Sequence, residues 1–190
     1  MILSNREILE AIDAGDIVID PLSQRDPTEV PFNTTAIDLR LAPTITVPRK
    51  LPAAQRLDAP YDPAYVARNS DQYQASTAQP VALEPNQFVL AQTMERIGLP
   101  IRPGRPTYAA RVEGKSSRAR LGMLIHFTAP TIHSGFDGQI TLEMINLSQN
   151  SIQLVPGVYI CQLIFERVSN EPANARNQFT GQVDPAGRRA

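Results

Sequence analysis

Hydrophobic residues near the start of the chain follow a helical period. The pattern predicts a helix over residues 5–14. Ser4 and Glu7 have the spacing of a capping box at its start, and Gly15 is a natural end. The apolar face of this helix consists of Ile8, Leu9 and Ile12.

After this helix the period changes from 3.6 to two. Residues 35–41 alternate apolar side chains with Asp38 and Arg40, which predicts a half-buried strand. Turns rich in Gly and Pro separate five further predicted strands: residues 88–93, 108–112, 123–128, 139–145 and 158–166. Short strands with this punctuation predict a mainly β fold, a sandwich or a barrel, with one short N-terminal helix and few others.

Two segments keep neither period. Residues 48–80 hold five prolines among Ala, Gln and Asp, and we interpret them as an irregular excursion with room for one short helix. Residues 169–190 are polar and predict a flexible tail. We therefore expect a single domain over residues 1–168, followed by that tail.

Composition supports one compact domain. The chain has 190 residues, 42% of them hydrophobic, and 17 prolines that favour short elements. Lys and Arg number 18 against 19 Asp and Glu, so the net charge of −1 argues against nucleic acid as a partner. No apolar run approaches the roughly 20 residues of a membrane span, so we expect a soluble cytoplasmic protein without a membrane partner.

A single cysteine limits the chemistry. Cys161 cannot form an internal disulfide, which suits a reducing compartment. With only His126 and His133 besides it, one chain cannot build a zinc site of four Cys or His ligands.

The densest polar cluster spans residues 113–120 and follows a predicted strand. It contains the Gly-Lys-Ser ending of a P-loop, but Ala109 stands where that motif needs another glycine. Ser116 could still cap a short helix through Leu121, whose N–H groups together with Lys115 would favour an anion. Arg120 would lie on the same side of that helix as Ser116. A solvated charged turn is the alternative, and composition gives it even odds.

Glu143 stands in the predicted strand 139–145. Ile140, Leu142 and Met144 share one face, so Gln139, Thr141 and Glu143 share the other. In a cleft, partial burial would suit Glu143 to proton transfer. The alternative is an acid on the wet face of an antiparallel sheet, which base rates favour.

Two weaker signals are Gln162 in the last strand and residues 179–182 in the tail. An aromatic with Gly and Gln in a polar tail is typical of a segment that becomes ordered over a ligand.

In this order the segments resemble the dCTP deaminase family, a branch of the dUTPase-like superfamily. The motif Gly-Lys-Ser-Ser-x-x-Arg-Leu-Gly at 114–122, followed by Gly-x-Ile-Thr-Leu-Glu at 138–143, is the specific pair. Further matching segments are residues 1–9, 35–41, 156–163 and 179–182. The resemblance implies a dUTPase-like distorted β-barrel or jelly-roll (β-clip) fold. It also implies zinc-independent hydrolysis of dCTP to dUTP and ammonia in a homotrimer with active sites between subunits.

The resemblance also implies residue roles. Glu143 corresponds to the general acid/base, Ser116 and the Ala129 carbonyl to groups that position the water, and Arg120 to the cation beside the glutamate. Mg²⁺ would bind through the triphosphate, without protein side chains or zinc, and the tail would close over the site. The implied nucleotide-binding residues are Lys115, Ser116, Ser117, Arg118, Ala119, Arg120, His133, Thr141, Leu142, Glu143, Gln162, Phe179 and Gln182. The sequence leaves open whether dTTP inhibits the enzyme.

Two departures from the family pattern bear on specificity. His133 replaces an aspartate near the deoxyribose, and Gln178 replaces a lysine before the tail aromatic. A lost charge pair at about 4 Å is worth up to roughly 4 kcal/mol before solvent compensation, so we expect weaker triphosphate binding or a preference for fewer phosphates.

Two other functions remain open. A dUTP diphosphatase of the same fold uses the aspartate missing at 133 to orient its water, so deamination is favoured over that reaction and over a bifunctional enzyme. A non-catalytic deoxynucleotide-binding protein would bind without turnover.

Overall fold

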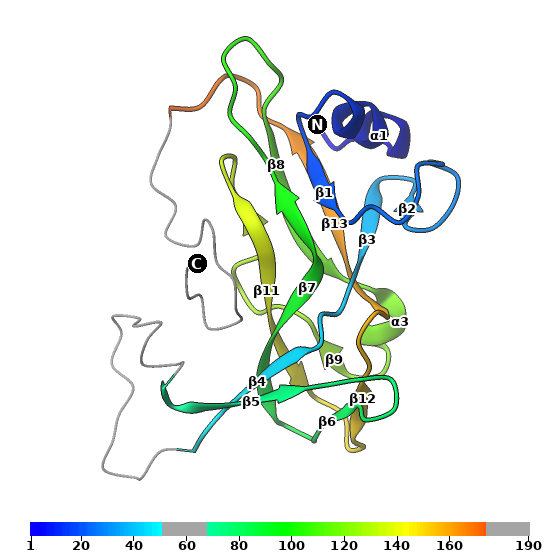
Figure 1. Cartoon of the computed structure of the whole chain (residues 1–190), viewed down its shortest axis with the longest axis vertical. Coiled ribbons are helices and arrows are strands. Elements are labelled where there is room, and N and C mark those ends of the chain that lie inside the picture. The colour runs from blue at the N-terminus through cyan, green and yellow to red at the C-terminus, as the bar shows by residue number, and fades with distance from the viewer. Residues whose placement is uncertain (51–67, 174–190) are drawn as a thin grey trace.

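The computed structural model describes residues 1–50 and 68–173, and strands dominate them (Figure 1). One sheet, the β7 sheet, contains in order β5 (Ser70–Gln74), β4 (Thr44–Pro48), β7 (Phe88–Gly98), β11 (Asp137–Asn146) and β9 (Met123–Leu124), with β1 (Val18–Asp20) also beside β7. The second, the β13 sheet, contains β10 (Thr131–Ile132), β8 (Tyr108–Gly114), β13 (Tyr159–Arg167), β3 (Ala36–Arg40) and β2 (Phe32–Asn33). A small third sheet pairs β12 (Ile152–Leu154) with β6 (Val81–Leu83). The mainly β prediction is confirmed.

Helix α1 (Asn5–Asp13) confirms the predicted N-terminal helix. The capping box is formed in both directions, because Ser4 N–H donates to Glu7 Oε2 at 2.8 Å and Glu7 N–H donates to Ser4 Oγ. Ile8 and Ala11 are buried against the sheets, and Gly15 follows with a φ of +71°, a conformation that favours glycine.

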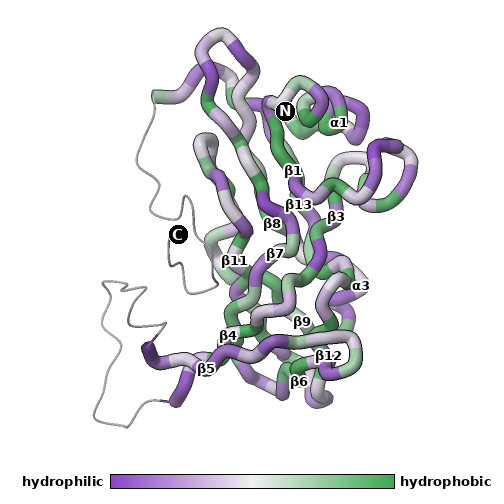
Figure 2. Tube along the Cα trace, viewed as in Figure 1, coloured by the Kyte–Doolittle hydropathy of each residue, from purple (hydrophilic) through white to green (hydrophobic). Residues whose placement is uncertain are grey.

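The core lies between the sheets, and their strands alternate between a core face and an outer face. In β11 every second residue from Gly138 to Asn146 is buried, and those between are half-buried. The banding along the longer strands in Figure 2 follows this alternation, whereas β5 is hydrophilic along most of its length. Ile140, Leu142 and Met144 contribute to the core.

Strand β3 corrects one expectation. Its alternating sequence predicted a half-buried strand, yet Ala36, Ile37, Asp38 and Leu39 are all buried. The polar positions have partners, since Asp38 bonds Asn33 and Lys115 and Arg40 bonds Glu95 of β7 at 2.6 Å. A buried polar residue is tolerated when its hydrogen bonds are made.

The structure also shifts several boundaries. Strand β7 continues five residues beyond the predicted end at Thr93, whereas β9 ends at Leu124 instead of residue 128. Part of the predicted excursion is ordered, because residues 70–74 form β5 against β4. Residues 51–67 lie outside the described residues. No helix in the described part of the chain is long and apolar enough to cross a membrane.

Candidate active site

Glu143 lies on the outer face of the β7 sheet, as predicted. Its neighbours in β11, Leu142 and Met144, are fully buried, while Glu143 itself is half-buried. Oε2 accepts a long hydrogen bond of 3.4 Å from the Phe127 backbone N–H. Among the described residues this is the hydrogen bond that Glu143 makes, so most of its acceptor capacity remains for a ligand or water.

Apolar side chains lie near Glu143 on the outer face of the sheet. Phe88 and Leu124 are the cross-strand partners of Ile145, which lies two residues after Glu143 on the same face of β11. The Phe127 ring meets the Phe88 ring edge to face, with centroids 5.7 Å apart. We call Phe88, Leu124 and Phe127 the β9 patch; each is at least one-third exposed. The outer face around Glu143 therefore carries apolar side chains, and the described residues leave these side chains partly exposed.

The predicted anion-binding block begins where β8 ends. Helix α3 (Ser116–Ala119) is a single turn, and Lys115, not Ser116, is its N-cap. No side chain caps the helix, so the expected Ser116 cap is wrong. Ser116, Ser117 and Arg120 are exposed, and the Ser116 carbonyl accepts from Arg120 N–H at 3.0 Å.

Lys115 turns back toward the β13 sheet. Its Nζ donates to Oδ2 of Asp38, a carboxylate whose side chain is only 7% exposed. Gln162 is the Cα partner of both Asp38 and Glu113 on its two neighbouring strands. Residues directly opposite in a sheet share a face, so Glu113, Gln162 and Asp38 form a polar row beside Lys115.

Cys161 lies next to this row. Burial raises the pKa of its thiol well above the usual range, and the nearby carboxylates of Glu95 and Asp38 raise it further, while Lys115 opposes them. The thiol therefore stays protonated and unreactive, since the thiolate is the nucleophilic form.

The two groups of predicted residues are not joined by a hydrogen bond or an ion pair among the described residues. Among the described residues, no hydrogen bond or ion pair joins Glu143 to Ser116 or to Arg120. Glu143 belongs to the β7 sheet, whereas the block after β8 extends from the β13 sheet (Figure 1). Because the expected sites lie between subunits, Arg120 as the cation beside the glutamate stays a prediction.

The other predicted residues occupy several settings. Ala129 and His133 are exposed and flank β10, and Leu142 is in the core, where only its backbone could reach a ligand. Thr141 is half-buried, and its Oγ1 has no hydrogen-bond partner among the described residues. Arg118 is half-buried, on the far side of the helical turn from Ser116. Predictions for Phe179, Gln182 and Gln178 lie outside the described residues.

Asp137 is the aspartate nearest in sequence to His133. It begins β11, and its Oδ2 accepts from Arg96 Nη2 at 2.5 Å. His133 is exposed, and its carbonyl accepts from Phe136 N–H.

Sequence reasoning missed Asp38, His126 and Gln92 as candidates. The alternation of residues 35–41 places Asp38 on the polar side of a half-buried strand, although its position between apolar residues is a usable signal. His126 Nδ1 is buried without a partner among the described residues, directly before Phe127. Gln92 is 3% exposed and lies opposite Thr141. Its Nε2 is also buried without a hydrogen-bond partner among the described residues. No sequence signal marks a strand glutamine of this kind.

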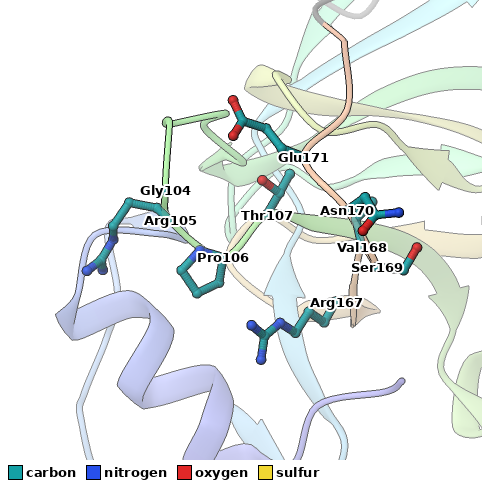
Figure 3. A pocket seen from close by; sticks show the side chains of 9 residues that line it. All are labelled: Gly104, Arg105, Pro106, Thr107, Arg167, Val168, Ser169, Asn170 and Glu171. Carbon is teal, nitrogen blue, oxygen red and sulfur yellow. The ribbon is translucent and has the colours of Figure 1, made fainter.

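A hollow of about 360 Å³ lies elsewhere, between residues 104–107 and 167–171 (Figure 3). It precedes β8, while the Lys115 block follows β8, so roughly 20 Å of strand separates them. Arg105, which lines the hollow, donates two hydrogen bonds to Asp16: Nε to Oδ1 at 2.9 Å and Nη2 to Oδ2 at 2.7 Å. None of the predicted site residues lines this hollow.

The residues that the structure describes contain no group of three or more His, Cys, Asp or Glu side chains placed to hold a metal ion.

Comparison with known proteins adds the chemistry of relatives to this geometry. The model of the dCTP deaminase-like family matches residues 2–168. A protein of Methanosphaera stadtmanae named "dCTP deaminase, dUMP-forming" is 34% identical, over 97% of this chain and 91% of the relative. A "dCTP deaminase" of Natronomonas pharaonis is 33% identical, over all of this chain and 94% of the relative.

The fold is also known from a crystal structure. The 2'-deoxycytidine 5'-triphosphate deaminase of Agrobacterium tumefaciens superposes with a TM-score of 0.64 and 20% identity. The match covers 88% of this chain and 48% of that one. The expected fold is thereby confirmed.

Proposed function

Because the chain belongs to the dCTP deaminase-like family, we propose that it removes the amino group of dCTP by hydrolysis, with Glu143 as the general acid/base. The observation that carries this proposal is the setting of Glu143: a half-buried carboxylate on an outer strand face, with one weak donor and apolar neighbours. Such a carboxylate can take up and return a proton, since no cation in the described part of the chain fixes its charge.

The reaction needs one water and no redox partner. Glu143 takes a proton from water and passes it to N3 as the water oxygen bonds to cytosine C4. Glu143 then carries the proton of the new C4 hydroxyl to N4, the C4–N4 bond breaks as the C4=O bond forms, and ammonia departs, which leaves the uracil base. Ser116 and the Ala129 carbonyl position the water, and Arg120 stabilises the glutamate.

These groups come together between subunits. Glu143 makes no hydrogen bond or ion pair with Ser116 or Arg120 among the described residues of one chain, so a second copy supplies the missing partners. The β9 patch beside Glu143, with Leu121 and Leu147 also more than half exposed, supports an interface there. A homotrimer with shared sites satisfies both observations.

The phosphates bind at the block after β8. Lys115, Ser116 and Ser117 offer an ammonium group and two exposed hydroxyls at the start of α3. Arg118, Ala119, His133, Thr141, Leu142 and Gln162 complete the nucleotide contacts, together with Phe179 and Gln182 of the tail. Mg²⁺ enters with the triphosphate, where it neutralises phosphate charge.

The immediate product is dUTP. Loss of diphosphate would need a carboxylate near the deoxyribose, and position 133 is His while Asp137 is paired with Arg96. The alternative product is dUMP, which is favoured by the name "dCTP deaminase, dUMP-forming" of the Methanosphaera relative. A dUTP diphosphatase without deamination and a non-catalytic binder are the competing functions.

One assay separates these possibilities. Purified protein is incubated with dCTP or with dUTP, each with Mg²⁺, and ammonia and diphosphate are measured separately. Ammonia without diphosphate from dCTP supports the proposal, and both together indicate dUMP formation. Diphosphate from dUTP without ammonia from dCTP would identify a diphosphatase, and binding without either product would identify a non-catalytic protein.

A further inference from the structure

Asp38 is a buried carboxylate outside the proposed catalytic and nucleotide-binding residues. It lies in β3, where its backbone N–H donates to the Pro31 carbonyl at 2.8 Å. Oδ1 accepts from Asn33 Nδ2 at 2.9 Å, and Oδ2 accepts from Lys115 Nζ. Both oxygens therefore have a partner, and among the described residues only Lys115 compensates the negative charge.

The pair is hard to separate. The Asp38 side chain is 7% exposed and that of Lys115 is 22% exposed. If Lys115 moved out to a phosphate, Asp38 would remain as a buried charge with one neutral partner, and an uncompensated buried charge is strongly destabilising. A phosphate at the start of α3 therefore meets Lys115 while the lysine is still bound to Asp38.

A bound lysine differs from a free one in what it offers an anion. The net charge of the Lys115–Asp38 pair is zero, and the negative member lies on the same strand face as Gln162 and Glu113. Lys115 retains N–H groups for a phosphate oxygen, but its long-range attraction for additional phosphate charge is cancelled by Asp38.

We propose that Asp38 is a specificity-determining residue, which holds Lys115 in a buried ion pair and so limits how strongly the site prefers nucleotides with more phosphates. This inference rests on the proposed phosphate-binding role of Lys115. It differs from a purely structural role in a measurable way, because it predicts that removing the carboxylate tightens phosphate binding.

The first test compares ligands by phosphate number. In Asp38→Asn the side-chain shape is kept and the charge is removed, so binding of dCTP and of inorganic tripolyphosphate should tighten by at least about fivefold, with steeper salt dependence. Binding of dCMP should change less than about twofold, because one phosphate gains less from a single added charge. Asp13→Asn is the control, since Asp13 pairs with Arg25 on the surface. Unchanged or weaker dCTP and tripolyphosphate binding in Asp38→Asn would overturn the inference.

The second test is independent of nucleotide chemistry. Lys115→Met should lower the thermal midpoint by about 5 °C or more, because it leaves Asp38 uncompensated. The double variant Asp38→Asn, Lys115→Met should recover most of that loss. If the two single effects add instead, the pair is not coupled and the inference fails.

The two tests separate this inference from the proposed function. Tighter tripolyphosphate binding in Asp38→Asn, without ammonia release from dCTP by the wild type, would support the inference and refute the proposed reaction. Ammonia release from dCTP by the wild type, with unchanged phosphate selectivity in Asp38→Asn, would support the proposed reaction and refute the inference.

Discussion

Glu143 differs in its partners from three other acidic side chains on the sheets. Asp38, Glu95 and Glu166 each have a cationic partner, at 2.8 Å for Glu166 with Arg111. Glu143 has only the long bond from Phe127 N–H among the described residues. The oxygens of Glu143 therefore keep most of their acceptor capacity for a bound ligand or water.

The first prediction concerns this residue. Glu143→Gln keeps the shape but removes the proton acceptor, so ammonia release should fall at least about 10²-fold. Nucleotide binding should stay within about tenfold, as a hydrogen-bonding side chain remains. Steady-state kinetics and equilibrium titration with dCTP measure the two effects. Glu166→Gln is the control and should react at the wild-type rate; a near-normal rate in Glu143→Gln would mean that another group is the base.

The second prediction is a pH dependence at Glu7. Hydrogen bonds from the Ser4 backbone N–H and hydroxyl lower the pKa of Glu7 below its ordinary 4.5. A lowered folded-state pKa stabilises the protein above pH 4.5, and this stabilisation disappears as the pH falls through the folded value. Glu7→Gln should therefore be less stable than the wild type at pH 7, and the difference should shrink as the pH falls below 4.5 through the lowered pKa. Urea unfolding across that range provides the measurement, and a constant difference would contradict it.

At the scale of elements, the sequence predicts the burial of side chains best where it depends on the alternation within a single strand. The alternation in β11 placed Leu142 inside and Glu143 outside without knowledge of its neighbours, because successive side chains point to opposite faces. Strand β3 has the same alternation, but its outward positions are covered by partners 55 and 77 residues away, Glu95 and Lys115. No local pattern encodes that cover.

The candidate site also has a part that the sequence predicts and a part that it does not. Lys115, Gln162 and Glu143 were identifiable from motifs, and the structure places the first two side by side. The position of the Lys115 side chain was not predictable, since it depends on the pairing of β8, β13 and β3 across the sheet. The short helix was predictable, but its cap was not, because Ser116 is already inside the turn.

The third prediction concerns the connection from α3 to β9, which carries Arg120. Gly122 has a φ of +85°, and a Cβ there would lie 2.8 Å from the Ser148 backbone nitrogen. Gly157 has a similar φ of +81° with nothing within 4 Å of such a Cβ. Gly157→Ala should cost about 1–2 kcal/mol of unfolding free energy from backbone strain alone. Gly122→Ala should cost at least about 1 kcal/mol more, because the backbone must also shift. Denaturant titrations compare them, and equal losses would contradict the clash.

On the scale of the whole molecule, the net charge of −1 does not reveal how the charged side chains are distributed. The buried anions are matched by cations, as in Glu95 with Arg40 and Asp16 with Arg105. The exposed Arg120 has no acidic partner among the described residues, so it remains for a negatively charged ligand or a second chain. Near-neutral composition is thus compatible with phosphate binding at one place.

The last prediction tests assembly, because the proposed site is complete only if a second copy meets the face that carries Glu143. Leu147 is 57% exposed and follows the end of β11, near the β9 patch, since its N–H donates to the Gly122 carbonyl. Leu147→Asp would place a charge in that interface and should shift the trimer to monomer with loss of ammonia release. Ile2 is 46% exposed but pairs with Glu166 at the other end of the β13 sheet. Ile2→Asp should therefore remain trimeric and active.

Sedimentation velocity and the ammonia assay on the same samples decide the matter. An active monomeric Leu147→Asp would show that one chain holds the complete site. Mixing inactive Glu143→Gln with an inactive Arg120 variant gives the decisive result. If the two residues serve one site from different chains, mixed trimers regain part of the wild-type rate, since some interfaces combine an intact Glu143 with an intact Arg120. If both residues act from the same chain, mixing restores nothing.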